Sequence, residues 1–573
     1  MKIDLLLKNV NVFNSYIKQF VNANVAILDG KVLYVDKSKC KVFEAKKVME
    51  CNNKFLVPGL IDIHMHIESS MTTPEVFCET VASYGVTSIV SEPHEIANVK
   101  GIRGVEAMIE GAKNAKIDVF YGIPSSVPST DSSLETTGDI ISFEDMNKLS
   151  DTEGVICVGE VMNYRGVIED DTLEICKFLK HLKKTKPNFI VEGHCPRLVD
   201  LDLAKFLYLG INGDHTEHSL EEVKQRIENG MFMEIQHKML KKEIIDYIVE
   251  NNLYEHIGFV TDDVMPDILV NEGHLNLLIK RAIELGMSPE NAIYCGTFTP
   301  ARRMNLTDRG AIAPGKLADM LLLESLQEFD IAYTFKNGEI IYDKSKGKTY
   351  SKQKYRFPED FYKSVNIKSL KEEDLDILVP NDKVKDGHVL CRVMEVNDGG
   401  TFTKEVERRI RVVDGKLDLS DSDCLYVEVF ERYGKNNNIG FGLVTGDIIK
   451  SGAVATTYAH DHHNLLVVGK SKKDMIIALN NVVESSGGFA VANNNEILAK
   501  VELSIGGILS EDSMDVLGFN VSKVKKSLVE LGYKHYNPIM SLCTLSLPVS
   551  PELKITDKGI VRVKERKVVD LFI

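Results

Sequence analysis

The stretch GLIDIHMHIE at residues 59–68 sets the interpretation of this 573-residue sequence, because it is an apolar strand pattern that ends in two histidines one residue apart. Residues i and i+2 of a strand point to the same face, so His64 and His66 can present both imidazoles to one metal ion. An isolated pair of this kind would suit a half-buried strand with two hydrogen-bonded histidines equally well. The downstream sequence favours the metal site.

Composition predicts a globular protein that acts on a small molecule. Apolar residues make up 44% of the chain, and a net charge of −15 argues against broad adhesion to nucleic acid or to anionic membranes. The ten cysteines include no CxxC pair, the N-terminus lacks a signal-peptide pattern, and no apolar run is long enough to span a bilayer. We therefore expect a cytoplasmic protein with free thiols and with no membrane or nucleic-acid partner.

Between residues 57 and 306, short apolar runs alternate with segments of helical spacing, which is typical of parallel β/α units. Eight runs are predicted to be strands, at residues 60–66, 85–91, 117–123, 154–160, 188–194, 210–215, 231–236 and 257–262. Eight units over about 250 residues is the size of a closed (β/α)8 barrel. The predicted fold class is therefore α/β with a TIM-like barrel.

The barrel is predicted to be an insertion in a smaller domain. Residues 1–56 and 307–345 show strand patterns broken by turn signals, and we expect them to pair as one small β-sandwich. Residues 346–384 are predicted to be a solvated connection, and residues 385–573 a separate C-terminal α/β domain.

Ionisable side chains gather where the predicted barrel strands end. In chain order they are His64, His66, Glu92, His94, Glu160, His194, His215, Asp262 and Asp263. The carboxyl ends of the strands form the active-site face of such a barrel. Six of these residues, four histidines and two carboxylates, would suit a pair of Mn²⁺, Fe²⁺ or Zn²⁺ ions, with Glu160 able to bridge them. Two ions can hold a shared hydroxide at neutral pH, which predicts metal-assisted hydrolysis.

Several motifs resemble the adenine deaminase family of the amidohydrolase superfamily, and the resemblance spans nearly the whole chain. The motifs are HIESSM at 66–71, EPHEIANV at 92–99, GEVMN at 159–163, EGHCP at 192–196 and TDD at 261–263. The resemblance implies hydrolytic deamination of adenine to hypoxanthine and ammonia by a metal-bridged hydroxide, within purine salvage. A homo-oligomer is expected. The stretch EIQHK at 234–238 departs from the family pattern, which leaves the substrate contacts open.

The resemblance also implies roles for single residues. One ion would be held by His64, His66, Glu160 and Asp262, and the other by Glu160, His194 and His215, with Mn²⁺ or Fe²⁺ expected and Zn²⁺ an alternative. Glu160 and Asp262 are the expected catalytic residues. Asp262, with one oxygen on the metal and the other free, would carry a proton to the departing amine.

Other positions carry two interpretations. Glu68, His94 and Asp263 would line the substrate pocket, or would serve as loop caps and as partners of the ligands. His218 competes with His215 as a metal ligand, and we favour His215 because it lies nearer the strand end.

A second histidine-rich stretch, HDHH at residues 460–463, lies in the predicted C-terminal domain and resembles a recurrent string of that domain. No partner ligands lie near it in the sequence, so a structural or pocket-closing role is favoured over a third metal. Two other functions remain open. One is a cyclic amidase such as a dihydroorotase or hydantoinase, which also attacks an sp² carbon, and the other is a non-catalytic barrel scaffold, against which the intact ligand set argues.

Overall fold

The computed structural model describes residues 1–39, 41–348, 354–397 and 400–573. The chain divides into two compact units. The first, here called the barrel unit, comprises Met1–Pro93, Met108–Ser125 and Ser142–Tyr355. The second, the C-terminal unit, comprises His94–Ala107, Ser126–Ile141 and Arg356–Ile573. Of the connection predicted at 346–384, residues 349–353 lie outside the described residues.

The barrel unit contains all eight predicted parallel strands in the predicted order, which confirms the TIM-like fold. The strands are β6 Leu60–Met65, β7 Val86–Ser91, β8 Asp118–Ile123, β9 Val155–Val161, β10 Ile190–Gly193, β11 Gly213–Asp214, β12 Phe232–Ile235 and β13 Ile257–Phe259. A parallel bridge between Met65 and Asp262 joins the first strand to the segment after the last. Apolar side chains such as Ile61, Ile63 and Val260 fill a core between the strands.

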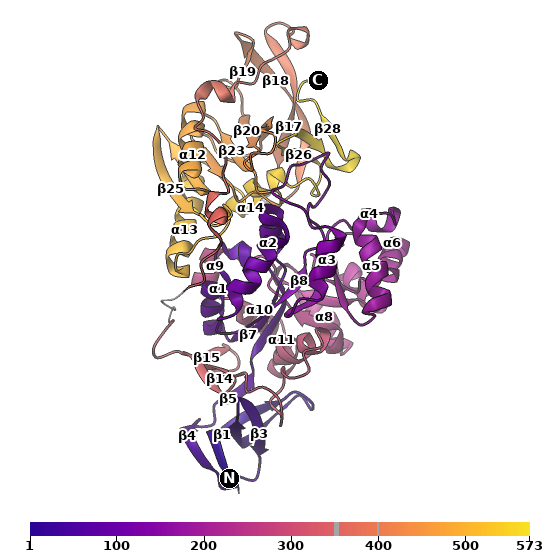
Figure 1. The fold of residues 1–573 in the computed structure, drawn as a ribbon, viewed down its shortest axis with the longest axis vertical. Helices are drawn as coiled ribbons and strands as arrows, with labels where there is room; N and C mark the ends of the chain where they lie inside the picture. The colour runs from indigo at the N-terminus through magenta and orange to yellow at the C-terminus, as the bar shows by residue number, and fades with distance from the viewer. Residues whose placement is uncertain (40, 349–353, 398–399) are drawn as a thin grey trace. The chain divides into compact units, whose positions relative to one another are not determined.

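Helices alternate with these strands, and their apolar faces explain their positions. They are α1 Pro74–Val81, α2 His94–Ala112, α3 Phe143–Ser150, α4 Tyr164–Glu169, α5 Glu174–Thr185, α6 Asp200–Tyr208, α7 Leu220–Glu228, α8 Lys242–Glu250, α9 Pro266–Asn271, α10 Leu275–Glu284 and α11 Pro289–Arg303. In α5 the buried residues Ile175, Phe178, Leu179 and Leu182 follow the spacing of one helical face. Figure 1 shows α4, α5 and α6 grouped beside α3.

The strands before and after the barrel share one sheet. They are β1 Lys2–Asn14, β2 Gln19–Leu28, β3 Lys31–Asp36, β4 Glu44–Glu50, β5 Phe55–Pro58, β14 Met320–Ser325, β15 Asp330–Lys336 and β16 Glu339–Asp343. Strand β5 pairs antiparallel with β14, and Leu7, Val10, Met320 and Phe335 lie in their common core. The barrel is therefore an insertion within this sheet.

The C-terminal unit is built on a nine-stranded sheet with the order β19-β18-β17-β21-β20-β23-β22-β24-β25. Its strands are β17 His388–Val396, β18 Thr403–Val413, β19 Lys416–Asp418, β20 Leu425–Phe430, β21 Ile439–Thr445, β22 Ala453–Thr456, β23 Leu465–Gly469, β24 Gly488–Asn493 and β25 Glu496–Glu502. Three further strands, β26 Leu553–Thr556, β27 Gly559–Arg562 and β28 Lys567–Val569, form a small sheet. The helices are α12 Lys472–Glu484, α13 Met514–Glu530 and α14 Pro538–Cys543. Across the described ranges, no helix has the length and hydropathy needed to cross a membrane.

Candidate metal centre and its neighbours

The structure brings the six predicted metal ligands together at the carboxyl ends of the barrel strands. His64 lies in β6 and His66 directly follows it, Glu160 lies near the end of β9, and His194, His215 and Asp262 follow β10, β11 and β13. Three overlapping groups of these side chains, with Asp263 in one of them, place ligand atoms close enough to share an ion. Six residues far apart in the sequence thus surround one small volume.

Glu160 occupies the centre of this arrangement. Its Oε1 lies 3.5 Å from His66 Nε2, while its Oε2 lies 2.6 Å from His194 Nδ1 and 3.3 Å from His215 Nε2. The two oxygens of one carboxylate therefore face different histidines, an arrangement that would let Glu160 contact two ions. Burial alone would raise the pKa of Glu160, but His194 and His215 hold that pKa well below its ordinary value.

The strand-end histidines are oriented by neighbouring groups. His66 Nδ1 lies 2.9 Å from the Glu92 carbonyl oxygen, and a hydrogen bond donated by that nitrogen directs the lone pair of Nε2 toward Glu160. Gly159 permits the approach of Glu92, because a Cβ at that position would lie 2.4 Å from Glu92 Cγ. His64 stacks on His215 with ring centroids 3.7 Å apart.

The donor set fits a divalent cation. His64 is only 3% exposed, and among the described residues its Nε2 has no hydrogen-bond partner. Burial lowers the pKa of His64 well below its ordinary value, so its imidazole is neutral and able to coordinate. Burial also opposes protonation of His215, yet the carboxylates of Glu160 and Asp262 raise its pKa to about 10. The site therefore favours positive charge, which a divalent metal supplies.

His215 and His218 occupy different surroundings. His215 faces Glu160, whereas His218 Nε2 lies 2.8 Å from the carboxylate of Asp214. Asp214 also accepts hydrogen bonds from Arg226 Nε at 2.8 Å and from Cys195 Sγ at 2.9 Å. A capping box between Ser219 and the first turn of α7 ends this segment immediately afterwards. His218 thus belongs to a buried network that anchors the ends of β10 and β11.

Asp262 differs from the sequence expectation in one respect. Its Oδ1 lies 3.5 Å from His66 Nε2, as expected for a ligand oxygen. Its Oδ2 is not free, because Gln236 Nε2 donates a hydrogen bond to it at 3.0 Å. The same amide nitrogen donates to the His215 carbonyl at 2.9 Å. Gln236 therefore ties two candidate ligands together.

Asp62 is a residue that the sequence analysis missed. It is fully buried in β6, and it accepts a hydrogen bond from Thr261 Oγ1 at 2.6 Å. Burial raises the pKa of Asp62 to about 7. The bond ties the first barrel strand to the segment that carries Asp262. Its position was signalled by the two-residue period that places residues 62, 64 and 66 on one face.

The three predicted substrate-lining residues lie in different places. Glu68 is buried in the 3-10 helix Ile67–Ser70, and Asp263 is exposed and accepts a hydrogen bond from Ser69 Oγ. His94 begins α2 and belongs to the C-terminal unit. Within the barrel unit the side chains of His194 and Asp262 are 34% and 15% exposed, so the ligand cluster opens to solvent at these residues and at Asp263.

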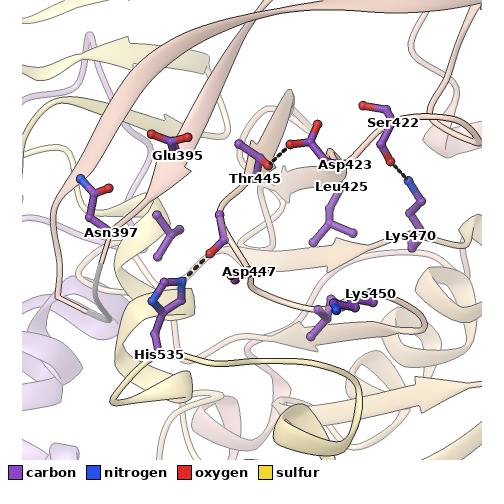
Figure 2. Close-up of a pocket in the computed structure, with 13 residues that line it drawn as sticks. Glu395, Asn397, Ser422, Asp423, Leu425, Thr445, Asp447, Lys450, Lys470 and His535 are labelled. Atoms are coloured by element: carbon purple, nitrogen blue, oxygen red, sulfur yellow. Dashed lines mark hydrogen bonds between the residues drawn. The ribbon is translucent and has the colours of Figure 1, made fainter.

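A separate cavity of about 560 Å³ lies in the C-terminal unit (Figure 2). Figure 2 shows acidic and basic side chains around it, including Glu395, Asp423, Lys470 and His535. Asp423 accepts a hydrogen bond from Thr445 at 2.9 Å, and Lys470 donates to the Ser422 carbonyl at 2.5 Å. None of the predicted site residues is among those that line it. These internal pairings give the cavity no catalytic arrangement.

Comparisons with known proteins place the chain in a family. Residues 55–341 match the amidohydrolase family, and residues 400–567 match the adenine deaminase C-terminal domain. The adenine deaminase of Clostridium perfringens is 50% identical, with 100% of both chains covered. Adenine deaminase 2 of Shouchella clausii is 47% identical, and the adenine deaminase of Lactobacillus delbrueckii subsp. bulgaricus is 43% identical, each over 100% of this chain and 99% of the relative. The chain is therefore a member of the adenine deaminase family, within the amidohydrolases.

Proposed function

We infer that this chain catalyses the hydrolytic deamination of adenine to hypoxanthine and ammonia. Its family membership extends over the full chain, and the cyclic amidase and scaffold alternatives are not favoured. The observation at the site that supports the inference is the placement of Glu160, whose two oxygens face different histidines.

We propose that the site holds two divalent ions, with Mn²⁺ or Fe²⁺ preferred and Zn²⁺ an alternative. His64, His66 and Asp262 would hold one, His194 and His215 would hold the other, and Glu160 would bridge them. The donor atoms are nitrogen and oxygen without a thiolate, which suits these ions. When bound, the ions supply Lewis acidity and lower the pKa of a water molecule toward neutrality.

Asp262 is the proposed proton carrier. In the net reaction, water oxygen bonds to C6 of adenine and the bond from C6 to the amino nitrogen breaks. One water proton leaves with the amino group as ammonia, and the other ends on the purine ring of hypoxanthine. The carboxylate of Asp262 lies at the solvent-exposed part of the cluster, and Gln236 fixes its orientation. Each carboxylate oxygen has two lone pairs, so Asp262 can accept and return a proton while it keeps the Gln236 hydrogen bond.

Glu68 and Asp263 are proposed to line the substrate pocket, and the substrate role of His94 stays a prediction. We also propose that the protein forms a homo-oligomer. A cytoplasmic location is proposed because the nine cysteines among the described residues are all free, as in proteins of reducing compartments.

The direct test supplies adenine to the purified, Mn²⁺-loaded full chain and measures ammonia and hypoxanthine together. Equal amounts of both products are expected, and Glu160→Gln should lose ions and activity in parallel because the bridge loses its charge. Dihydroorotate and hydantoin serve as substrate controls. Hydrolysis of either one without adenine deamination would reject the proposed function in favour of a cyclic amidase.

A further inference from the structure

A second cluster of imidazoles and carboxylates lies wholly within the C-terminal unit. It consists of His94, Glu95, His460, Asp461 and His463. The first two residues begin α2, and the other three follow β22, more than three hundred positions later in the chain. Each of the five is at most 5% exposed. No partner ligands lie near residues 460–463 in the sequence, but the fold brings His94 and Glu95 beside them.

Four donor atoms of this cluster face one another. His94 Nε2 lies 3.7 Å from Glu95 Oε1 and 3.8 Å from Asp461 Oδ1. His460 Nδ1 lies 3.5 Å from Asp461 Oδ1 and is in direct contact with Glu95 Oε1. Two imidazole nitrogens and two carboxylate oxygens therefore form a compact set drawn from two separate segments.

The spacing of these atoms resembles that of a coordination shell. Bonds of 2.0–2.2 Å in a tetrahedral site place neighbouring ligand atoms about 3.3–3.6 Å apart. The distance of 3.5 Å lies within this range, and those of 3.7 and 3.8 Å are slightly longer. The contact between Glu95 Oε1 and His460 Nδ1 is closer than this range, so these two atoms would have to move apart around an ion. Two neutral imidazoles and two carboxylates would also balance the charge of one divalent ion.

The buried carboxylates of the cluster are not fully satisfied by hydrogen bonds. Glu95 is 1% exposed and Asp461 is 3% exposed. Glu95 Oε1 is in contact with His460 Nδ1, whereas Asp461 Oδ2 has no hydrogen-bond partner among the described residues. Leaving a buried polar group unsatisfied costs about 1–3 kcal/mol, and more when the group is charged. His463 Nε2 contacts the other oxygen of Glu95, which positions Oε1 toward His94 and His460.

We propose that His94, Glu95, His460 and Asp461 form a metal site for one first-row divalent ion such as Zn²⁺. His463 is a positioning residue that orients Glu95. The site goes beyond the proposed deaminase chemistry, because none of its residues is among the barrel ligands. Its closed surroundings match structural metal sites, which leave no coordination position open to substrate. Under this proposal His94 binds the ion instead of the substrate.

The test compares metal content in full-length proteins that are loaded with Zn²⁺ and then desalted. The wild-type chain should hold one more ion per chain than Glu95→Gln and His463→Asn. His462→Asn is the matched control, because His462 lies in the same buried stretch but bonds to the Asn464 backbone amide at 3.0 Å. The control should keep the wild-type count. Zinc-edge anomalous diffraction of the wild type should place a peak within the cluster, beside His94, Glu95, His460 and Asp461.

Two results would overturn the proposal. One is a wild-type crystal with occupied barrel ligands and no anomalous peak at the cluster, which remains decisive if a variant fails to fold. The other is an unchanged ion count in Glu95→Gln, which would make the cluster a hydrogen-bonded structural network. Neither the anomalous peak nor the ion count depends on deaminase activity. Both results can therefore be interpreted even if the proposed function is wrong.

Discussion

The two histidine–carboxylate clusters of this protein use similar donor atoms in opposite surroundings. At the barrel strand ends, His194 and Asp262 have side chains that are 34% and 15% exposed. In the C-terminal unit, the members of the second cluster are at most 5% exposed. Catalytic metal sites keep a position open for water and substrate, whereas structural sites are closed. The other four barrel ligands are at most 4% exposed. The exposure of His194 and Asp262, rather than the type of donor, therefore separates the two candidate sites by role.

The residues that contact the carboxylates of the two clusters also differ in how much solvent access they leave. In the barrel, Gln236 reaches Asp262 from one side and leaves the solvent side of the carboxylate accessible. In the second cluster, His463 contacts Glu95 from within the buried stretch that also supplies His460. Gln236 therefore orients Asp262, which must exchange protons with solvent and substrate. His463 holds Glu95, which has no proton to exchange in its proposed role.

The largest effect is expected from Asp262→Asn. An amide cannot accept and return the proton, and positioned acid–base groups typically contribute about 10²–10⁴-fold. We expect kcat for adenine to fall by that factor in protein that is saturated with Mn²⁺, which compensates for the loss of one ligand charge. Asp263→Asn is the matched control and should mainly raise KM. Near wild-type kcat in a fully loaded Asp262→Asn protein would exclude Asp262 as the proton carrier.

His215→Asn and His218→Asn test which of these two nearby histidines binds the metal. His215→Asn should lower metal affinity by more than about 10²-fold, the upper range for residues that only support ligands. His218→Asn should keep its ions and lose about 1–3 kcal/mol of stability, because its buried bond to Asp214 is lost. Metal analysis and denaturant unfolding of both proteins measure these outcomes. A loss of ions confined to His218→Asn would reverse the assignment.

These residues also show how much could be predicted from the sequence. The eight barrel strands were predictable because a parallel barrel repeats one β/α unit, and its strand ends meet at one face. His64, His66 and Glu160 could be nominated as ligands for the same reason. The second cluster was not predictable, because no period relates residue 95 to residue 460. The sequence places Gln236 after a barrel strand, but its bond to Asp262 depends on side-chain geometry.

Gln236→Leu should have a smaller effect than the ligand substitutions. Outer partners of metal ligands typically contribute about 10–100-fold to affinity or activity. Loss of the amide removes the hydrogen bonds to Asp262 and to the His215 carbonyl, so we expect kcat/KM to fall within that range. Gln236→Glu is the informative comparison, because it keeps the size and adds negative charge beside Asp262. If both variants matched the wild type, Gln236 would not position Asp262.

The smallest effect on activity is expected for a buried lysine of the C-terminal unit, whose substitution should alter stability alone. Lys554 is fully buried, and its Nζ donates hydrogen bonds to the Thr401 and Thr544 carbonyls at 2.5 and 2.8 Å. Burial lowers the pKa of Lys554 from 10.5 to about 7. Between these values the unfolded chain binds a proton that the folded chain lacks, so this group makes stability rise with pH.

Lys554→Met removes that titration. The free energy of unfolding, measured by denaturant titration, should rise in the wild type relative to the variant between about pH 7 and pH 10. The limiting slope is about 1.4 kcal/mol per pH unit for one proton. Deamination rates should stay the same, because Lys554 belongs to the C-terminal unit and to neither proposed metal site. Parallel pH profiles for the two proteins would show that the ammonium group keeps its proton in the fold, with the two carbonyls compensating for burial. A loss of activity without a change in stability would contradict the assignment of Lys554 to the stability of the C-terminal unit.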